Sequence, residues 1–302
     1  MEQLVKLLPI AGDTVVYLAI DISIAILLLF AIRSLSGFFT KISVRQELGE
    51  KDNFAFGISI AGRMLSLTIV LSAVVGRHVN MGFEAAAVGM FLFGAMGILL
   101  VKIGRFAHDK LVLNRLDKDD MIAQKNVSVA LVDASSGIAA AIIAKSIIDW
   151  AQGADVNAFI AVFSGALVVL AVLLFTTRLY EYRFAESNQN SSFQKTLCNG
   201  QIALAIQHSG NLIGIAIAVS SASKLLAFEA TAYVSNLTGW LIVGLGLAFS
   251  LMLITSVAKR VVLLGVNWKS EVALQHNIGV ASIEAVLSIG IALLFSNVFV
   301  ST

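Results

Sequence analysis

Long apolar runs alternate with short polar stretches along the whole chain. Each of eight windows has about 20 mostly apolar residues, the length of a helix that crosses a bilayer. The runs are continuous rather than alternating, which excludes a closed barrel, and a helix satisfies its own backbone groups in lipid. The pattern therefore predicts an all-α polytopic membrane bundle. We place its spans at residues 14–32, 54–76, 85–103, 127–148, 157–177, 201–223, 236–258 and 277–298.

Composition supports a membrane protein. Of 302 residues, 58% are hydrophobic and 13% are charged, and the mean hydropathy is +0.89. Soluble domains carry roughly 25% charged residues, so soluble enzymes, secreted scaffolds, nucleic-acid binders and disordered regulators are excluded. The lone cysteine, Cys198, excludes an internal disulfide and a multi-cysteine metal site. We expect no cofactor, no metal and no nucleic-acid partner; the lipid bilayer is the main partner.

Basic residues set the orientation. The loops after the first, third, fifth and seventh spans hold 16 of the 21 Lys and Arg residues. Such loops face the cytoplasm in membrane proteins, so both termini are predicted to be periplasmic. The first span follows Glu2 and Asp13 without a basic segment, and we interpret it as a retained helix rather than a signal peptide.

The four returning spans begin alike. Each starts with an amide residue, and the starts are 73, 75 and 76 residues apart. Every position four or eight residues after the amide is small, which favours close helix packing. The chain is therefore four hairpins in two four-helix repeats, at 1–150 and 151–302. The amides are Asn53, Asn126, Gln201 and Asn277; the small residues are Gly57, Ala130, Ala205, Ala281, Ala61, Ala134, Ser209 and Ala285.

The same helix face bears ionisable residues seven positions after the amide. Asp133, His208 and Glu284 occupy this position in three of the four hairpins. At 1.5 Å per residue they lie about 10 Å inside the membrane, so we expect the returning helices to line the interior. Successive hairpins share one orientation, which predicts a pseudo-symmetry axis along the membrane normal. A pseudo-four-fold bundle, or two pseudo-two-fold halves, would bring the three residues together.

The first returning span has further small and hydroxyl residues after its amide. After Asn53 come Ala55, Gly57, Ser59, Gly62 and then the run Leu65-Ser-Leu-Thr-Ile-Val-Leu-Ser72. This run resembles the signature of the DUF350 family of small bacterial inner-membrane proteins. The resemblance covers residues near 14–150 and 157–298, and it implies two tandem four-helix domains in the bacterial inner membrane, with no catalytic residues to transfer. Arg63 and Gln201 depart from the pattern, which argues against four equivalent ligands.

Charged residues within spans indicate function because they are costly in lipid, about 2.5–3.5 kcal/mol each. Asp133, His208 and Glu284, together with Gln207 and Asn211, form the candidate polar site. Carboxylates beside an imidazole bind a cation or relay protons. The alternative is that neutral carboxyls only hydrogen-bond between helices and fix their register.

Asp21 and Arg63 form a second candidate. Asp21 lies 12 residues outward of Arg33, and Arg63 lies ten residues into the second span, so both are expected near the midplane. An ion pair there would act as a structural clamp or as a gate. The asparagines that begin the returning spans are expected to be N-caps.

No nucleotide-binding loop, zinc-protease motif or nucleophile elbow occurs, so we do not expect an enzyme. The leading hypothesis is passage of an ion, a proton or a small solute at the repeat interface. The alternative is a non-transporting scaffold that recruits cytoplasmic proteins through its basic loops in envelope homeostasis. A dry interior would favour the scaffold. Homo-oligomers would form through the glycine-rich odd-numbered spans.

Overall fold

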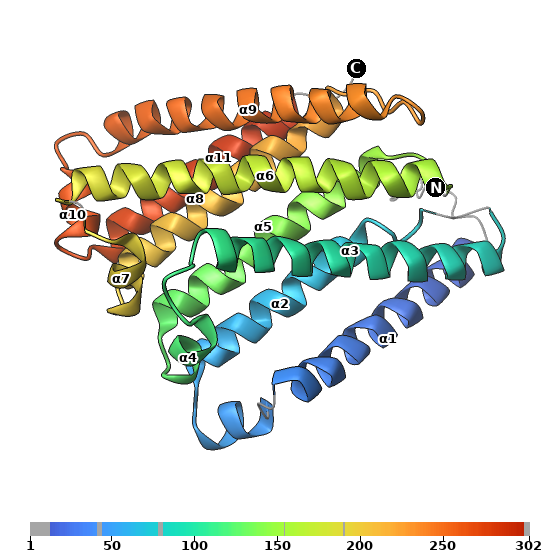
Figure 1. Ribbon diagram of the computed structural model, residues 1–302, viewed down its shortest axis with the longest axis horizontal. Helices are drawn as coiled ribbons and strands as arrows, with labels where there is room; N and C mark the ends of the chain where they lie inside the picture. The colour runs from blue at the N-terminus through green and yellow to red at the C-terminus, as the bar shows by residue number, and fades with distance from the viewer. Residues whose placement is uncertain (1–12, 41–43, 78–80, 154, 190, 299–302) are drawn as a thin grey trace, which may run out of the picture.

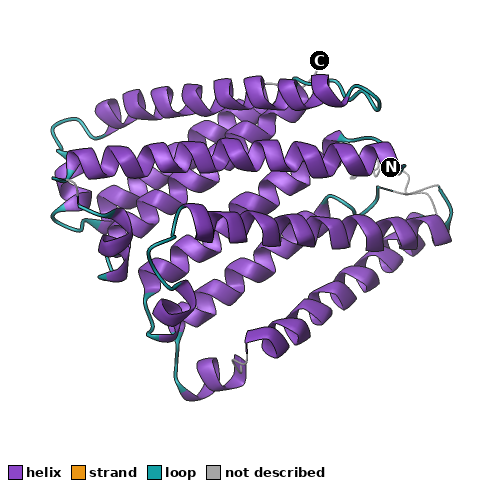
Figure 2. Cartoon of the chain, viewed as in Figure 1, coloured by secondary structure: helices purple, strands orange, loops and turns teal. Residues whose placement is uncertain are grey.

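The computed structural model describes residues 13–40, 44–77, 81–153, 155–189 and 191–298. This part of the chain is helix and turn without a strand (Figure 2). Eight helices are long and apolar enough to cross a membrane, as predicted. They are α1 (Thr14–Thr40), α2 (Phe54–Ser72), α3 (Phe83–Leu111), α5 (Val127–Trp150), α6 (Val156–Ser187), α8 (Ile202–Ser220), α9 (Tyr233–Val262) and α11 (Ile278–Val298). Both termini, Lys6 and Lys41 lie outside the described residues.

Each of the four units has a long helix, a short helix and a returning helix. The short helices lie where the sequence predicts only polar loops. Three of them begin at a residue whose side chain caps the helix: Asp117, Ser192 and Asn267. A further short helix, η2 (Ser221–Lys224), continues α8. The four short helices of the units are η1 (Gln46–Glu50), α4 (Lys118–Ala123), α7 (Phe193–Cys198) and α10 (Trp268–Ala273).

The returning helices begin as predicted at their amides. The side-chain oxygens of Asn53, Asn126 and Asn277 each accept a backbone N–H three residues later, at 3.0–3.1 Å. The expected N-caps are thus confirmed for the asparagines. Gln201 makes no such bond, because its side chain is longer and reaches elsewhere.

The spans form two layers. The returning helices α2, α5, α8 and α11 form one row, in which each packs on the next (Figure 1). The long helices α3, α6 and α9 cross this row in the other layer, and α1 packs beside α3. Among the described residues the row is open, with α2 and α11 at its two ends, so the pseudo-four-fold bundle, one of the two predicted arrangements, is wrong. α5 and α8 are the most buried spans, whereas α2 and α11 each expose one face.

The long helices extend beyond the predicted apolar windows on the side of the basic loops, hereafter the basic-loop side. α3 continues to Leu111 and α6 to Ser187, well past the predicted ends at 103 and 177. Lys, Arg and Glu are good helix formers, so a helix does not end where its apolar run ends. If the depth of a residue in the membrane is counted from the first basic residue of the adjoining loop, the residue is therefore placed too close to the basic-loop side.

Glycines allow the closest helix contacts in the row. A Cβ placed on Gly62 of α2 would overlap the backbone of Ala134 on α5, and one on Gly210 of α8 would overlap the backbone of Ala285 on α11. These two contacts are equivalent: both glycines lie nine residues after the amide of their unit, and both alanines lie eight after theirs. The same packing therefore occurs in both halves of the chain.

We expect Gly210→Ala to destabilise the protein by about 1–3 kcal/mol, the usual effect of forcing extra carbon into a packed contact. The new methyl group would push α8 away from α11. Thermal unfolding in detergent would measure the loss. Gly290→Ala is the matched control, since a Cβ at Gly290 of α11 meets nothing within 4 Å. Equal melting temperatures for the two variants would contradict this packing.

Candidate functional site

Asp133 is the centre of a buried charge cluster in the first half of the chain. Its side chain is fully buried on α5 and accepts a hydrogen bond from Ser59 Oγ of α2 at 2.5 Å. Arg105 Nη2 of α3 and Lys118 Nζ of α4 lie 2.7 and 3.0 Å from Asp133 Oδ1. Arg63 Nη2 lies 3.7 Å from Oδ2. Three cations therefore surround one carboxylate, and both of its oxygens are occupied.

Glu284 of α11 is the corresponding carboxylate in the second half. It is also fully buried, and Lys259 Nζ of α9 lies 2.7 Å from its Oε2. Gln207 Nε2 of α8 donates to the same oxygen. The other oxygen, Oε1, has no hydrogen-bond partner among the residues that the structure describes. One cation therefore faces this carboxylate where three face Asp133.

The two clusters match residue by residue along the repeat. Asp133 and Glu284 both lie seven residues after their amide, and Ser59 and Gln207 both lie six after theirs. At the tenth position, however, the first half has a cation and the second has a neutral amide. The first residue of the short helix also changes from a lysine to an indole. These two differences are Arg63 against Asn211 and Lys118 against Trp268.

A cavity of ≈440 Å³ lies where the second half lacks these cations. It opens on the basic-loop side between α6, α8, α9, α10 and α11, and Glu284 and Lys259 line it. Asn211 Oδ1 and Thr255 Oγ1, which belong to buried residues of its lining, have no hydrogen-bond partner, like Glu284 Oε1. Three unpaired acceptor groups thus belong to the lining of one cavity. Gln207 lines it as well.

The predicted group of Asp133, His208 and Glu284 is divided by the structure. Asp133 and Glu284 lie on α5 and α11, with α8 between them, and have different partners. His208 is buried on α8, where its ring lies 6.1 Å from that of His108 and 4.7 Å from that of Phe193. His208 Nε2 makes no hydrogen bond. The expectation that the three residues come together is therefore wrong, and the two carboxylates lie in separate clusters.

The predicted Asp21–Arg63 ion pair is wrong. Asp21 accepts a hydrogen bond at 2.7 Å from the backbone N–H of Gly76, beyond the far end of α2, whereas Arg63 faces Asp133. The prediction counted depth from Arg33, but α1 continues to Thr40, so Asp21 lies near the other side of the membrane. The two residues are thus at different depths.

Three cations of the site were missed in the sequence. Arg105, Lys118 and Lys259 count there only as topology signals in loops. Arg105 and Lys259 in fact lie in the last two turns of long helices, and Lys118 begins α4. Continuing the helical pattern past the apolar windows would have placed Arg105 and Lys259 at the depth of the carboxylates.

Two tryptophans pack together toward the opposite side of the membrane. Trp150 and Trp240 are buried with their rings 5.4 Å apart, edge to face. Beyond them Arg77 donates to the carbonyl of Ile148 at 2.5 Å and to that of Gly153 at 2.8 Å, at the end of α5. Burial lowers the pKa of Arg77. The cavity beside Glu284, in contrast, opens on the basic-loop side.

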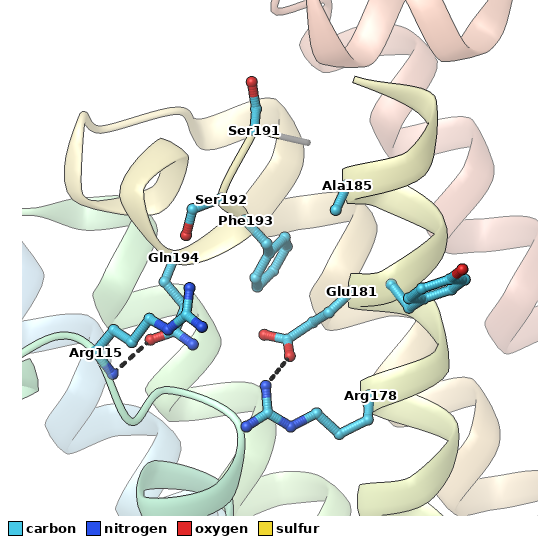
Figure 3. A pocket seen from close by; sticks show the side chains of 9 residues that line it. Arg115, Arg178, Glu181, Ala185, Ser191, Ser192, Phe193 and Gln194 are labelled. Atoms are coloured by element: carbon cyan, nitrogen blue, oxygen red, sulfur yellow. Dashed lines mark hydrogen bonds and ion pairs between the residues drawn. The ribbon is translucent and has the colours of Figure 1, made fainter. Parts of the chain in front are cut away.

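A smaller cavity of ≈330 Å³ lies beside α6 and α7 (Figure 3). Arg178 Nη1 lies 2.6 Å from Glu181 Oε2 there, and Glu181 Oε1 has no hydrogen-bond partner. The backbone N–H of Arg115 donates to Gln194 Oε1 at 2.7 Å, which joins the second and third units. The carboxylate of this cavity is paired within its own helix, unlike Glu284.

Comparison with known proteins gives one match. The family model described as Domain of Unknown Function (DUF350) matches residues 7–148 and again residues 152–299. Searches of curated proteins and of solved structures found no match. The two matched segments correspond to the two halves that contain Asp133 and Glu284.

Proposed function

The chain belongs to the DUF350 family as two tandem copies, and we propose that it passes a small cation or a proton through its second copy. Glu284 is the exchanging group, and the ≈440 Å³ cavity is the inner half of the path. We place the basic-loop side in the cytoplasm, in a bacterial inner membrane with both termini periplasmic, because of the bias in Lys and Arg.

The observation that supports this proposal best is the unpaired oxygen of Glu284 beside an open cavity. A buried carboxylate is costly unless cations or hydrogen-bond donors surround it. Asp133 obtains cations and donors for both oxygens from its own copy. Glu284 has Lys259 and Gln207 at one oxygen, and the other oxygen lies beside the cavity. A cation from solution would complete the second site as Arg63 completes the first.

The chemistry of the lining favours a cation over an anion at the inner end. The unpaired atoms of Glu284, Asn211 and Thr255 are oxygens that accept hydrogen bonds or bind a hard cation. Lys259 neutralises the charge of Glu284 but makes no hydrogen bond to those three oxygens. The basic residues at the mouth are exposed and therefore strongly screened by water and salt. They are Arg183, Arg260 and Lys269.

Passage of a cation then requires that the cation exchange at the Glu284 carboxylate and that the helices rearrange on the far side of Glu284. An entering cation competes with the Lys259 ammonium for the carboxylate, so Lys259 holds the site closed when it is empty. Because Trp150 and Trp240 pack tightly beyond this level, the path opens to the other side only when the helices move. This is the expected behaviour of an alternating-access protein rather than of an open pore.

Flux in liposomes tests the proposal. We expect purified protein to dissipate a proton or sodium gradient, read by dyes sensitive to pH or sodium, and Glu284→Gln to reduce the rate to that of empty vesicles. Glu186→Gln is the matched control, because Glu186 lines the same cavity but is exposed at its mouth. Flux that is equal in wild type and Glu284→Gln would overturn the assignment.

A scaffold without transport is the second candidate, and the closed first copy favours it. Both oxygens of Asp133 are occupied by partners from the chain itself, as expected of a charge that only fixes helix positions. Cytoplasmic proteins would then bind the basic loops. Under this alternative, wild-type vesicles leak no faster than empty ones, and changing the charge of the loops removes the partner.

A further inference from the structure

The first three units are each hydrogen-bonded to the next unit through the amide residue that begins the returning helix. The side-chain nitrogen of the amide donates to backbone carbonyls at the short helix of the following unit. These carbonyls belong to residues three to five positions before the amide of that following unit. The bonds are Asn53 to Ile122 at 3.0 Å, Asn126 to Leu197 and Cys198 at 3.2 and 2.8 Å, and Gln201 to Val272 and Ala273 at 3.1 and 2.9 Å. Gln201 gives up its N-cap but keeps this bond, so the bond between units is the shared feature.

The series stops at the last unit. Asn277 keeps the other two bonds of Asn53: its nitrogen donates to Glu271 at 2.9 Å, and its oxygen caps α11. Asn53 donates in the same way to Glu47, whose pKa is lowered by hydrogen bonds from Lys51 and Asn53. After Asn277 the described residues form only α11. Among the described residues it makes no bond between units.

The first unit lacks the complementary contact. Gly49 of η1 lies four residues before Asn53, the position at which Ile122, Leu197 and Ala273 accept such bonds. A Cβ placed on Gly49 meets nothing within 4 Å, so this part of η1 is uncovered. Within the described part of the chain, the Asn277 amide nitrogen retains one N–H beyond its bond to Glu271, and no bond is made to the Gly49 carbonyl.

The helix faces at the two ends are unpartnered in the same register. The ninth residue after the amide packs on the following unit: Gly62 on α5 and Gly210 on α11, where each meets the eighth residue. On α11 the ninth residue is Val286, which is 68% exposed. On α2 the eighth residue is Ala61, which is exposed, whereas its equivalents Ala134 and Ala285 are buried.

We propose that a second copy of this chain docks its α2 and η1 against α11 and α10 of the first and continues the row. Asn277 then donates to the second copy's Gly49 carbonyl, and Val286 packs on the second copy's Ala61. This contact is head-to-tail: each chain offers α11 and α10 to one neighbour and α2 and η1 to another, so the row of returning helices continues from chain to chain within the membrane. The contact lies on the returning helices, not on the glycine-rich long helices that the sequence favours.

Cysteine cross-linking tests the contact in full-length protein in its native membrane. In a Cys198→Ser background, Ala61→Cys with Val286→Cys is expected to give disulfide-linked oligomers when copper phenanthroline and oxygen oxidise the two thiols. The two positions lie at opposite ends of one chain, so the link must join two chains. Val16→Cys with Leu253→Cys, both exposed on α1 and α9, is the control and should stay monomeric.

The outcomes separate this proposal from others. Strong cross-linking by Ala61→Cys alone would indicate a symmetrical α2–α2 contact and would overturn it, as would a monomer by native mass spectrometry without cross-links. Val286→Trp should convert oligomers to folded monomers, because Val286 is 68% exposed within its own chain and a larger side chain there disturbs mainly the contact between chains. A Val286→Trp variant that remains oligomeric would also contradict the contact.

Discussion

Asn211→Arg is expected to abolish cation flux without unfolding the protein. The variant restores in the second copy the residue that the first copy has at the same position, Arg63. Its guanidinium would reach Glu284 and fill the cavity with a tethered cation, so that a soluble cation no longer competes for the carboxylate. Flux in liposomes should fall to the level of empty vesicles, with a melting temperature at or above that of wild type, since an added cation beside a buried carboxylate stabilises it.

The reciprocal change is the control for this prediction. Arg63→Asn removes one of the three cations around Asp133 but leaves Arg105 and Lys118 in place, so the carboxylate stays paired. We expect flux through the second copy to continue at the wild-type rate. A loss of flux in Arg63→Asn with normal flux in Asn211→Arg would reverse the assignment of the two copies.

Asp133→Asn is expected to destabilise the protein by about 3–5 kcal/mol, the usual result of removing one partner from a buried charge cluster. Arg105, Lys118 and Arg63 would lose the carboxylate that they share. Their mutual repulsion would then oppose folding, and an amide oxygen cannot offset it. Thermal or denaturant unfolding in detergent measures the loss.

Glu284→Gln is the matched comparison, because only Lys259 faces that carboxylate and the cavity beside it admits water. Its loss of stability should be clearly smaller than that of Asp133→Asn, while its loss of flux is complete. If the two variants lost equal stability, the two clusters would have the same role. The proposed division between a structural and an exchanging carboxylate would then be wrong.

The spans, the repeat and the two carboxylates were predictable because each leaves a local pattern. Apolar runs of span length mark the helices, and amides with small residues at fixed offsets mark the returning ones. The seventh position after the amide identified Asp133 and Glu284 without any structure. These features depend on one helix at a time.

What failed depends on more than one helix. A repeated sequence specifies that neighbouring units pack together, but not the rotation from one unit to the next, so an open row was not distinguishable from a closed bundle. Depth also misled, since α1 continues past Arg33 and places Asp21 beside Gly76. Lys118 was counted in a loop because α4 has only six residues, too few to give a periodic pattern.

The short helix α10 lies at both the proposed exchange site and the proposed contact between chains. Trp268 and Lys269 of α10 line the cavity that contains Glu284, and its carbonyls hold Gln201 of the preceding unit. The same helix lies at the end of the row, beside Asn277. A ligand that shifts α10 therefore changes the surface that a neighbouring chain would meet. By thermodynamic reciprocity, the neighbour changes the affinity for that ligand by the same factor.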